Sequence, residues 1–464
     1  MDLNKENSII LVAAMASFVV AYVSIVPTVA LPSMAQSFGL SNIMQNWVIN
    51  AFLFSVAIFA VPTGNLSGKY GIKRSFEIGS LILLIGVLAI PFATSPIFLI
   101  LFRAIQGFGA AIIYNTVMNI LTMGVSKEKR GRAIGILIAG VNIGIGLAPV
   151  LGGVLTYEFG WQSIFLFAVP FAILHILISH FMIKDEWVIG KENKFDRKGA
   201  ILWAVAIFLF VYGFTIIKQF EGIIMLIAGI ALLIVFAFLE LKTNHPVYDV
   251  GVFKNKIFAS SSFAAVLSFI ATYFFTYILN YHVQYIMGFN SEMAGMLLFV
   301  TPFVQILVSP SAGRLSDKFN SQILEAIGMS LVTISLLVLV FLNETTPLFV
   351  IVTAMVLEGV GYAIFSAPNT NLIMSSLKEE KSTVASVSVT VSRVLGQTLS
   401  LAMLTTIFNF IMGDVAIVPK YYHLLTLSSN ITCIVGTVLG IVTILACLIG
   451  LAPLKRKAGA NNFH

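Results

Sequence analysis

Residues 222–241 read GIIMLIAGIALLIVFAFLEL, and this stretch indicates the fold class. Its only charged residue, Glu240, stands next to its end. A helix needs about 20 apolar residues to cross a bilayer, so this segment is long enough to span one. A membrane-spanning strand alternates in polarity over about 10 residues, whereas this stretch is apolar on every face. It therefore predicts a transmembrane α-helix.

The same pattern recurs along the 464-residue chain, which is 58% hydrophobic and only 10% charged. Soluble domains carry about 25% charged residues, and one globule of this size has too little interior for so much apolar surface. The sequence therefore predicts an all-α polytopic membrane protein. Its fourteen expected helices cover residues 9–32, 45–67, 76–94, 97–122, 131–156, 162–183, 199–217, 222–241, 257–284, 292–312, 323–342, 347–376, 382–412 and 430–452.

The basic residues predict the orientation of these helices, because Lys and Arg are retained in cytoplasmic loops. Of the 27 Lys and Arg residues, Arg103 and Arg393 lie inside apolar blocks, and one set of alternate loops holds only Lys218 and Lys420. All the others lie in the opposite loops and the two ends of the chain. We therefore expect a multi-pass protein of the plasma membrane with both termini cytoplasmic. The net charge of +7 follows from this topology and does not indicate nucleic-acid binding.

Two loops share a pattern, which indicates an internal repeat. GNLSGKYGIKR spans residues 64–74 and GRLSDKFNSQ spans residues 313–322. Gly-x-Gly triplets begin at Gly107 and Gly359, and their separation along the chain is nearly the same as that of the two loops. Matched motifs are typical of transporters built from two parallel repeats, although chance similarity of glycine-rich loops is the alternative. We expect six-helix halves at 1–183 and 257–464, with a linker and an inserted helix pair at 184–256.

The sequence contains no Walker loop, dinucleotide fingerprint, nucleophile elbow or metal-ligand cluster. We therefore expect no enzyme activity, no cofactor and no metal.

Four segments carry a family resemblance. They are the loop signature at Gly64, Leu66, Gly71, Lys73 and Arg74, partly repeated at Gly313, Leu315 and Asp317; the set Arg103, Gln106, Gly107 and Gly109; the run Ala148, Pro149, Gly152 and Gly153, followed by Trp161; and Val29-Ala30-Leu31-Pro32. With these four segments in this order, the chain resembles the major facilitator superfamily, and within it the fourteen-helix drug:proton antiporter branch. The resemblance covers essentially the whole chain and implies proton-coupled export.

Three positions depart from that family pattern. Val23 stands where the branch usually has an Asp in the first helix, Gly68 replaces the Asp of the loop signature, and Gln162 replaces the Arg after Trp161. The first departure removes a favoured proton or cation site, so this chain lacks a group on which the proton coupling implied by the resemblance depends.

Charged groups deep in a membrane face a cavity or a partner, because an isolated charge there is costly. Glu358, Arg103 and Arg393 meet this criterion, whereas Glu77, Glu240 and Glu325 stand near helix ends, where we expect structural roles. Helical spacing puts two sets of residues on single faces. These sets are Glu358, Tyr362, Phe365 and Asn369, and Ser386, Thr390, Arg393 and Gln397.

Mixed polar and aromatic faces suit a cavity for amphipathic molecules, so we predict that these sets line it. Packing against neighbouring helices is the alternative, and the rise along each helix argues against a direct ion pair between Glu358 and Arg393. Gln106 and His282 are further cavity candidates. Arg103 either tunes a carboxylate and holds water, or is a structural hydrogen-bond hub. His282 is either a proton-sensitive group or structural.

Small residues recur every four positions in the block 131–156, at Gly140, Gly144, Ala148 and Gly152. They allow close helix contact, and Pro149 removes a backbone hydrogen bond. We predict that Gly144, Ala148, Pro149, Gly152 and Gly153, with Gly64, Gly71, Arg74 and Asp317 of the loop signatures, serve gating. A static contact is the alternative.

The residues and the resemblance together predict a secondary active transporter, coupled to protons, that exports small amphipathic or cationic compounds as a monomer. A lipid or metabolite carrier without proton coupling is the alternative within transport, favoured by Val23. A membrane sensor without transport activity is the alternative from another class.

Overall fold

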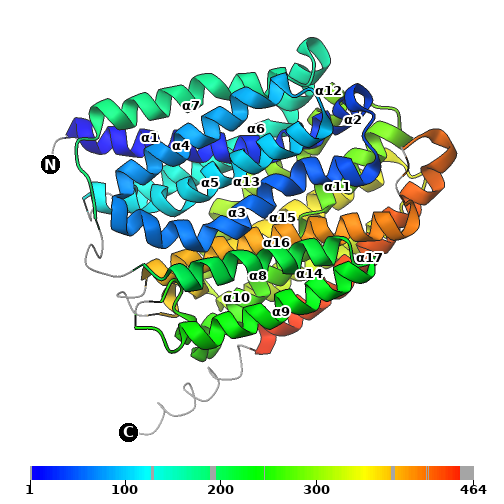
Figure 1. Ribbon diagram of the computed structural model, residues 1–464. Helices are drawn as coiled ribbons and strands as arrows, with labels where there is room; N and C mark the ends of the chain where they lie inside the picture. Colours follow the sequence, from blue (N-terminus) through cyan, green and yellow to red (C-terminus); the bar gives the residue numbers. More distant parts are fainter. Residues whose placement is uncertain are drawn as a thin grey trace, which may run out of the picture. The chain divides into compact units, whose positions relative to one another are not determined.

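The computed structural model describes residues 3–126, 130–188, 195–244, 246–377, 382–413, 415 and 417–449. Over these residues the chain is built of helices, and no β-strand occurs among them (Figure 1). Within the same ranges, fourteen helical segments are long and apolar enough to cross a membrane. These findings confirm the predicted fold class and the predicted number of spans.

The chain forms two compact units. Unit 1 holds Met1–Tyr248, Asn280–Phe299 and Phe408–Pro419, and unit 2 holds Asp249–Leu279, Val300–Ile407 and Lys420–His464. The three-part division expected at residues 183 and 256 rests on the sequence repeat and stays a prediction.

Unit 1 contains most of the N-terminal helices. They are α1 Leu3–Ile25, α2 Pro27–Phe38, α3 Asn42–Tyr70, α4 Ile72–Ala89, η1 Ile90–Phe92, α5 Pro96–Gly124, α6 Arg130–Phe159, α7 Ser163–Met182, α8 Arg197–Thr215, α9 Phe220–Glu240, the π-helical η4 His282–Ile286 and α12 Ser291–Leu298.

Unit 2 contains most of the remaining elements. They are η3 Val250–Lys254, α10 Lys256–Thr272, α13 Val300–Lys318, α14 Ser321–Leu339, α15 Leu348–Ser375, most of α16 Ser382–Ile411 and α17 Tyr422–Ile449. Three elements cross the division between the units: α11 Phe275–Tyr281, the end of α16 and the short η6 Pro419–Tyr421.

The first expected span is divided into α1 and α2 by proline chemistry. Pro27 begins α2 and Pro32 lies inside it. A proline has no backbone N–H, so the carbonyls four residues earlier, of Val23 and Thr28, lose their intrahelical donors. Side chains from other elements must therefore satisfy these two carbonyls.

The helix pair α8 and α9 packs together, and α8 also contacts α3. The indole Nε1–H of Trp203 on α8 donates to the carbonyl of Ala57 at 3.2 Å. On α9, large apolar side chains such as Ile227 and Phe238 are exposed. An exposed apolar face of this length suits lipid, as the sequence of 222–241 predicts.

Candidate functional site

Glu358 lies in the middle of α15 and is 5% exposed. The side-chain amide of Gln305 on α13 donates to its Oε2 at 3.4 Å. The two helices approach closely here, since a Cβ added at Gly359 would lie 2.9 Å from the carbonyl oxygen of Thr301. The sequence therefore correctly identified Glu358 as buried, and the structure adds Gln305 as its hydrogen-bond partner.

Tyr362 follows Glu358 by one helical turn and connects it to the other helices of unit 2. Its ring meets that of Phe269 on α10 edge-on, with centroids 5.9 Å apart. The guanidinium carbon of Arg393 on α16 lies 5.9 Å from the centroid of the same Phe269 ring. Both Arg393 and Glu358 lie within electrostatic reach of the Tyr362 hydroxyl. We call Phe269, Gln305, Glu358, Tyr362 and Arg393 the unit 2 cluster.

Glu358 and Arg393 share this cluster without pairing directly. Among the residues that the structure describes, their charged groups do not come within 4.0 Å of each other. This agrees with the vertical offset expected from the sequence.

The other predicted cavity residues have different surroundings. Phe365 and Asn369 are buried, and the Asn369 amide donates to the carbonyl of Ser261 on α10 at 3.0 Å. This end of the stripe therefore contacts a neighbouring helix. Thr390 and Gln397, one turn to either side of Arg393, are partly exposed. The side chain of Ser386 lies outside the described residues.

Arg103 on α5 joins three helices of unit 1. Its Nη1 donates to the Val23 carbonyl at 2.9 Å and to Oε1 of Gln106 at 2.6 Å, and its Nε donates to the Val48 carbonyl at 3.0 Å. The Val23 carbonyl is one of the two that lack an intrahelical donor because of proline. This geometry matches a hydrogen-bond hub, and a role in tuning a carboxylate stays a prediction.

The second carbonyl freed by proline accepts from Asn280 at the end of α11. The Asn280 amide donates to the Thr28 carbonyl at 2.8 Å. The chain then forms the π-helical turn η4, which begins at His282. His282 is 2% exposed, and neither ring nitrogen has a hydrogen-bond partner among the described residues. The structure thus buries His282 within unit 1, and its proposed role as a cavity residue stays a prediction.

The small residues of α6 form the predicted close contact, and their partners are α1 and Val26, the residue that follows it. A Cβ added at Gly144 would lie 2.6 Å from the Phe18 carbonyl oxygen, and one at Gly152 would lie 2.7 Å from Cγ2 of Val26. Ala148 is buried on the same helix. Near Pro149, Gly153 approaches the backbone of Ser291 on α12. Gating by these residues stays a prediction.

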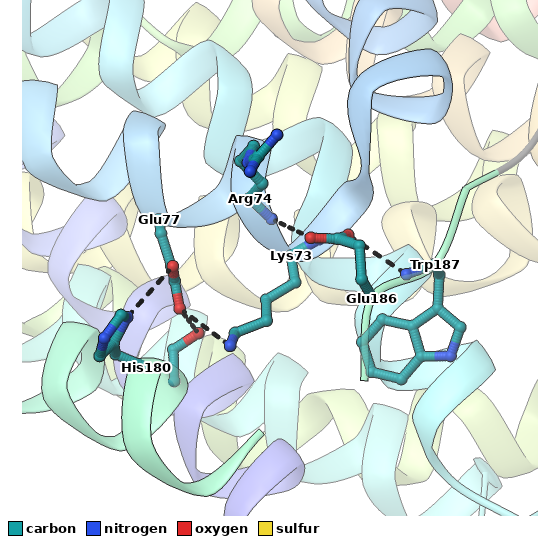
Figure 2. Close-up of polar contacts among 7 residues, drawn as sticks. Lys73, Arg74, Glu77, His180, Glu186 and Trp187 are labelled. Atoms are coloured by element: carbon teal, nitrogen blue, oxygen red, sulfur yellow. Dashed lines mark hydrogen bonds and ion pairs between the residues drawn. The ribbon is translucent and has the colours of Figure 1, made fainter. Parts of the chain in front are cut away.

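The end of the first loop signature forms the start of α4, where it is bound by a carboxylate that the sequence interpretation missed. Glu186, which follows α7, accepts from the backbone N–H groups of Lys73 at 2.9 Å and Arg74 at 3.0 Å (Figure 2). The Ile72 N–H donates to the Trp187 carbonyl at 2.9 Å. Gly71 has a φ of 109°, and a Cβ there would lie 2.7 Å from the Glu186 carboxyl. A glycine is therefore needed at this position.

Glu77, one turn after Lys73 on α4, is the centre of a second polar group (Figure 2). Its carboxylate lies 3.5 Å from Nζ of Lys73 and 3.6 Å from Nδ1 of His180, and it accepts from the Ser179 hydroxyl at 3.3 Å. The Gly64 candidate lies beside Asn115 on α5. The Asp317 side chain lies outside the described residues.

Four further residues belong to these sites, and the sequence interpretation missed the role or the depth of each. Phe269 gives no signal in an apolar block, and Glu186 lies in a polar segment that predicts only a linker. Glu325 was expected to reach the membrane interface from a helix end, but it is buried, since α15 and α17 cover that end of α14. Gln305 had no distinguishing pattern around it.

Known proteins resemble this chain over most of its length. The riboflavin transporter RibZ of Clostridioides difficile (strain 630) is 29% identical over 358 residues, 76% of this chain and 77% of RibZ. The multidrug resistance protein Stp of Mycobacterium tuberculosis (strain CDC 1551 / Oshkosh) is 26% identical over 415 residues, 87% of this chain and 76% of Stp.

The fold is also found among solved structures. The crystal structure of the peptide transporter POT in complex with sulfate matches with a TM-score of 0.71 at 15% identity, covering 97% of this chain and 94% of that one. The family model described as Major Facilitator Superfamily matches residues 13–401. The chain therefore belongs to the major facilitator superfamily.

Proposed function

We propose that the protein is a secondary active transporter that exports small amphipathic cations in exchange for protons. The unit 2 cluster carries this proposal. It combines one buried carboxyl group, Glu358, with the aromatic rings of Tyr362 and Phe269. A carboxylate attracts an organic cation in a membrane, and aromatic faces add cation–π attraction of about 0.5–2 kcal/mol each.

Exchange follows if the proton and the substrate compete for the Glu358 carboxyl group. A buried carboxylate without a cation is costly, and either a proton or a cationic substrate removes that cost. The Gln305 amide can donate to the carboxyl oxygen in both states and hold it in place. Release of a proton on one side of the membrane then favours capture of substrate on that side. The name of the relative Stp, a multidrug resistance protein, supports this substrate class.

A metabolite carrier is the second candidate, and Arg393 favours it. A planar heteroaromatic compound would stack on Phe269 and accept hydrogen bonds from the guanidinium beside that ring. The name of the relative RibZ, a riboflavin transporter, points to such a compound. In this case Glu358 would hold a polar edge of the substrate and would not need to bind a proton.

Transport by the purified protein in liposomes separates the two candidates. Ethidium and riboflavin serve as probes, each with and without a pH gradient. Ethidium movement that requires the gradient, with no riboflavin movement, is the expected result. Riboflavin movement that ignores the gradient would establish the carrier, and the absence of movement of both probes would contradict each candidate.

We also propose that the protein works as a monomer in the cell membrane with cytoplasmic termini. The distribution of Lys and Arg supports this orientation, since Lys420 lies in a loop of the sparsely charged set. Single cysteines placed at Tyr70 and at Lys420 test it, with the two native cysteines replaced by serine. In intact cells, an impermeant reagent should label position 420 and not position 70, and the reverse result would overturn the orientation.

A further inference from the structure

Unit 2 holds a second buried carboxyl group, Glu325, near the start of α14. Its side chain is 1% exposed, and its Oε1 has no hydrogen-bond partner among the described residues. Burial of an ionised carboxylate is energetically costly when no cation accompanies it. A proton removes that cost. The geometry is thus that of a group which binds a proton inside the protein.

The groups that face Glu325 are neutral. The Asn369 amide approaches it from α15 and the Cys447 thiol from α17. Cys447 is the titratable group that α17 places next to the Glu325 carboxyl group, and α15 places no charged side chain next to it. α13, which also touches α14, ends at Lys318, whose side chain lies outside the described residues. Neither described contact supplies a positive charge.

The predicted stripe of α15 connects Glu325 with Glu358. Glu358 stands at one end of that stripe and Asn369 at the other, about 16 Å apart along the helix axis. Asn369 is anchored by its bond to the Ser261 carbonyl, at 3.0 Å, while it faces Glu325. Glu358 of α15 and Glu325 of α14 therefore lie along one side of α15. Glu358 is near the centre of that helix, and Glu325 is near its C-terminal end.

We propose that Glu325 is a second proton-binding site of the transport cycle. The inference rests on the proposed proton exchange at Glu358. An O–H bond breaks at Glu358 and one forms at Oε1 of Glu325, with water carrying the proton between them. Glu358 is left ionised and Glu325 neutral. Glu325 then gives the proton to water at the end of unit 2 that carries the second loop signature.

The test uses full-length protein in liposomes with ethidium as the probe. Glu325→Gln cannot take up a proton but keeps the shape of the side chain. We expect it to lose transport driven by a pH gradient, while ethidium exchange between equal concentrations and the melting temperature stay at the wild-type values. Glu325→Asp should restore part of the driven transport. Cys433→Ser, which changes a buried thiol of α17, 14 residues before Cys447, should transport normally.

Each other outcome overturns a definite statement. Full proton-driven transport by Glu325→Gln would exclude a proton site there. If Glu325→Gln loses ethidium exchange and has a lower melting temperature, and Glu325→Asp does not restore transport, the role of Glu325 is structural and the inference is overturned. If Glu358→Gln uncouples transport while Glu325→Gln does not, the further inference alone fails. If wild-type transport ignores the pH gradient, the proposed function fails.

An infrared measurement keeps the test decisive if Glu325→Gln does not accumulate. The wild type and Glu325→Asp are titrated with pH, and the carbonyl band of protonated carboxyl groups is followed. A band that changes with pH and shifts in frequency in Glu325→Asp is expected. A spectrum identical in the two proteins would contradict the proposal.

Discussion

At the residue scale, two prolines determine which buried polar side chains are needed in unit 1. Pro27 and Pro32 leave the carbonyls of Val23 and Thr28 without intrahelical donors. Arg103 and Asn280 donate to these two carbonyls at 2.9 Å and 2.8 Å. An unpaired carbonyl in hydrocarbon costs several kcal/mol. Arg103 thus stabilises the break between α1 and α2 by donating to the Val23 carbonyl.

A double-mutant cycle tests this pairing. Arg103→Leu should lower the free energy of unfolding by about 2–4 kcal/mol, because the Val23 carbonyl and Gln106 lose their donor. Pro27→Ala supplies a backbone N–H to the same carbonyl, so the same Arg103 change should cost about 1 kcal/mol less in that background. Pro32→Ala is the control, because it supplies a backbone N–H to the Thr28 carbonyl and not to the Val23 carbonyl. The pairing would be contradicted if the cost of Arg103→Leu fell by the same amount in the Pro27→Ala and Pro32→Ala backgrounds.

At the element scale, the contact between α6 and α1 depends on side chains of minimal size. The carbonyl oxygen of Phe18 would lie 2.6 Å from a Cβ at Gly144, so this interface has no room for a larger residue. The opposite face of α6 is exposed at Ala139. One helix therefore has one face that tolerates added volume and one that does not.

Gly144→Leu should abolish transport, since the side chain would force α6 away from α1. The protein should still insert into the membrane, because the substitution is apolar. Ala139→Leu adds apolar volume on the exposed face and should transport at the wild-type rate. The measurement is ethidium transport at matched amounts of inserted protein. Wild-type activity of Gly144→Leu would remove this contact from the transport cycle.

A second element-scale contact is the attachment of the segment after α7 to the start of α4. The Glu186 carboxylate accepts from two backbone N–H groups, where the positive end of the helix dipole favours an anion. Glu186→Ala should therefore speed hydrogen exchange at Lys73 and Arg74. Glu221→Ala, in the first turn of α9, should leave that exchange unchanged. Unchanged protection in Glu186→Ala would contradict the attachment.

At the scale of the whole molecule, the sequence predicted the spans far better than their contacts. Long apolar runs are a strong signal, so the fourteen spans and the burial of Glu358 followed from composition and spacing. A helix that is apolar all round gives no periodic contrast to show which face meets which neighbour. Phe269 is one of many apolar residues in its block and could not be assigned to Arg393 or Tyr362. Glu325 was misjudged because its depth depends on coverage by α15 and α17.

The central claim is that one carboxyl group, Glu358, exchanges a proton for the substrate. It is tested most directly by measuring proton movement together with ethidium transport in liposomes that contain Glu358→Gln. Glu221→Gln, which removes an exposed carboxyl group in the first turn of α9, is the matched control, and the melting temperature of each variant reports on folding. We predict that Glu358→Gln keeps its melting temperature but moves neither protons nor ethidium under a pH gradient. Proton-coupled export by Glu358→Gln at the wild-type rate would contradict the claim.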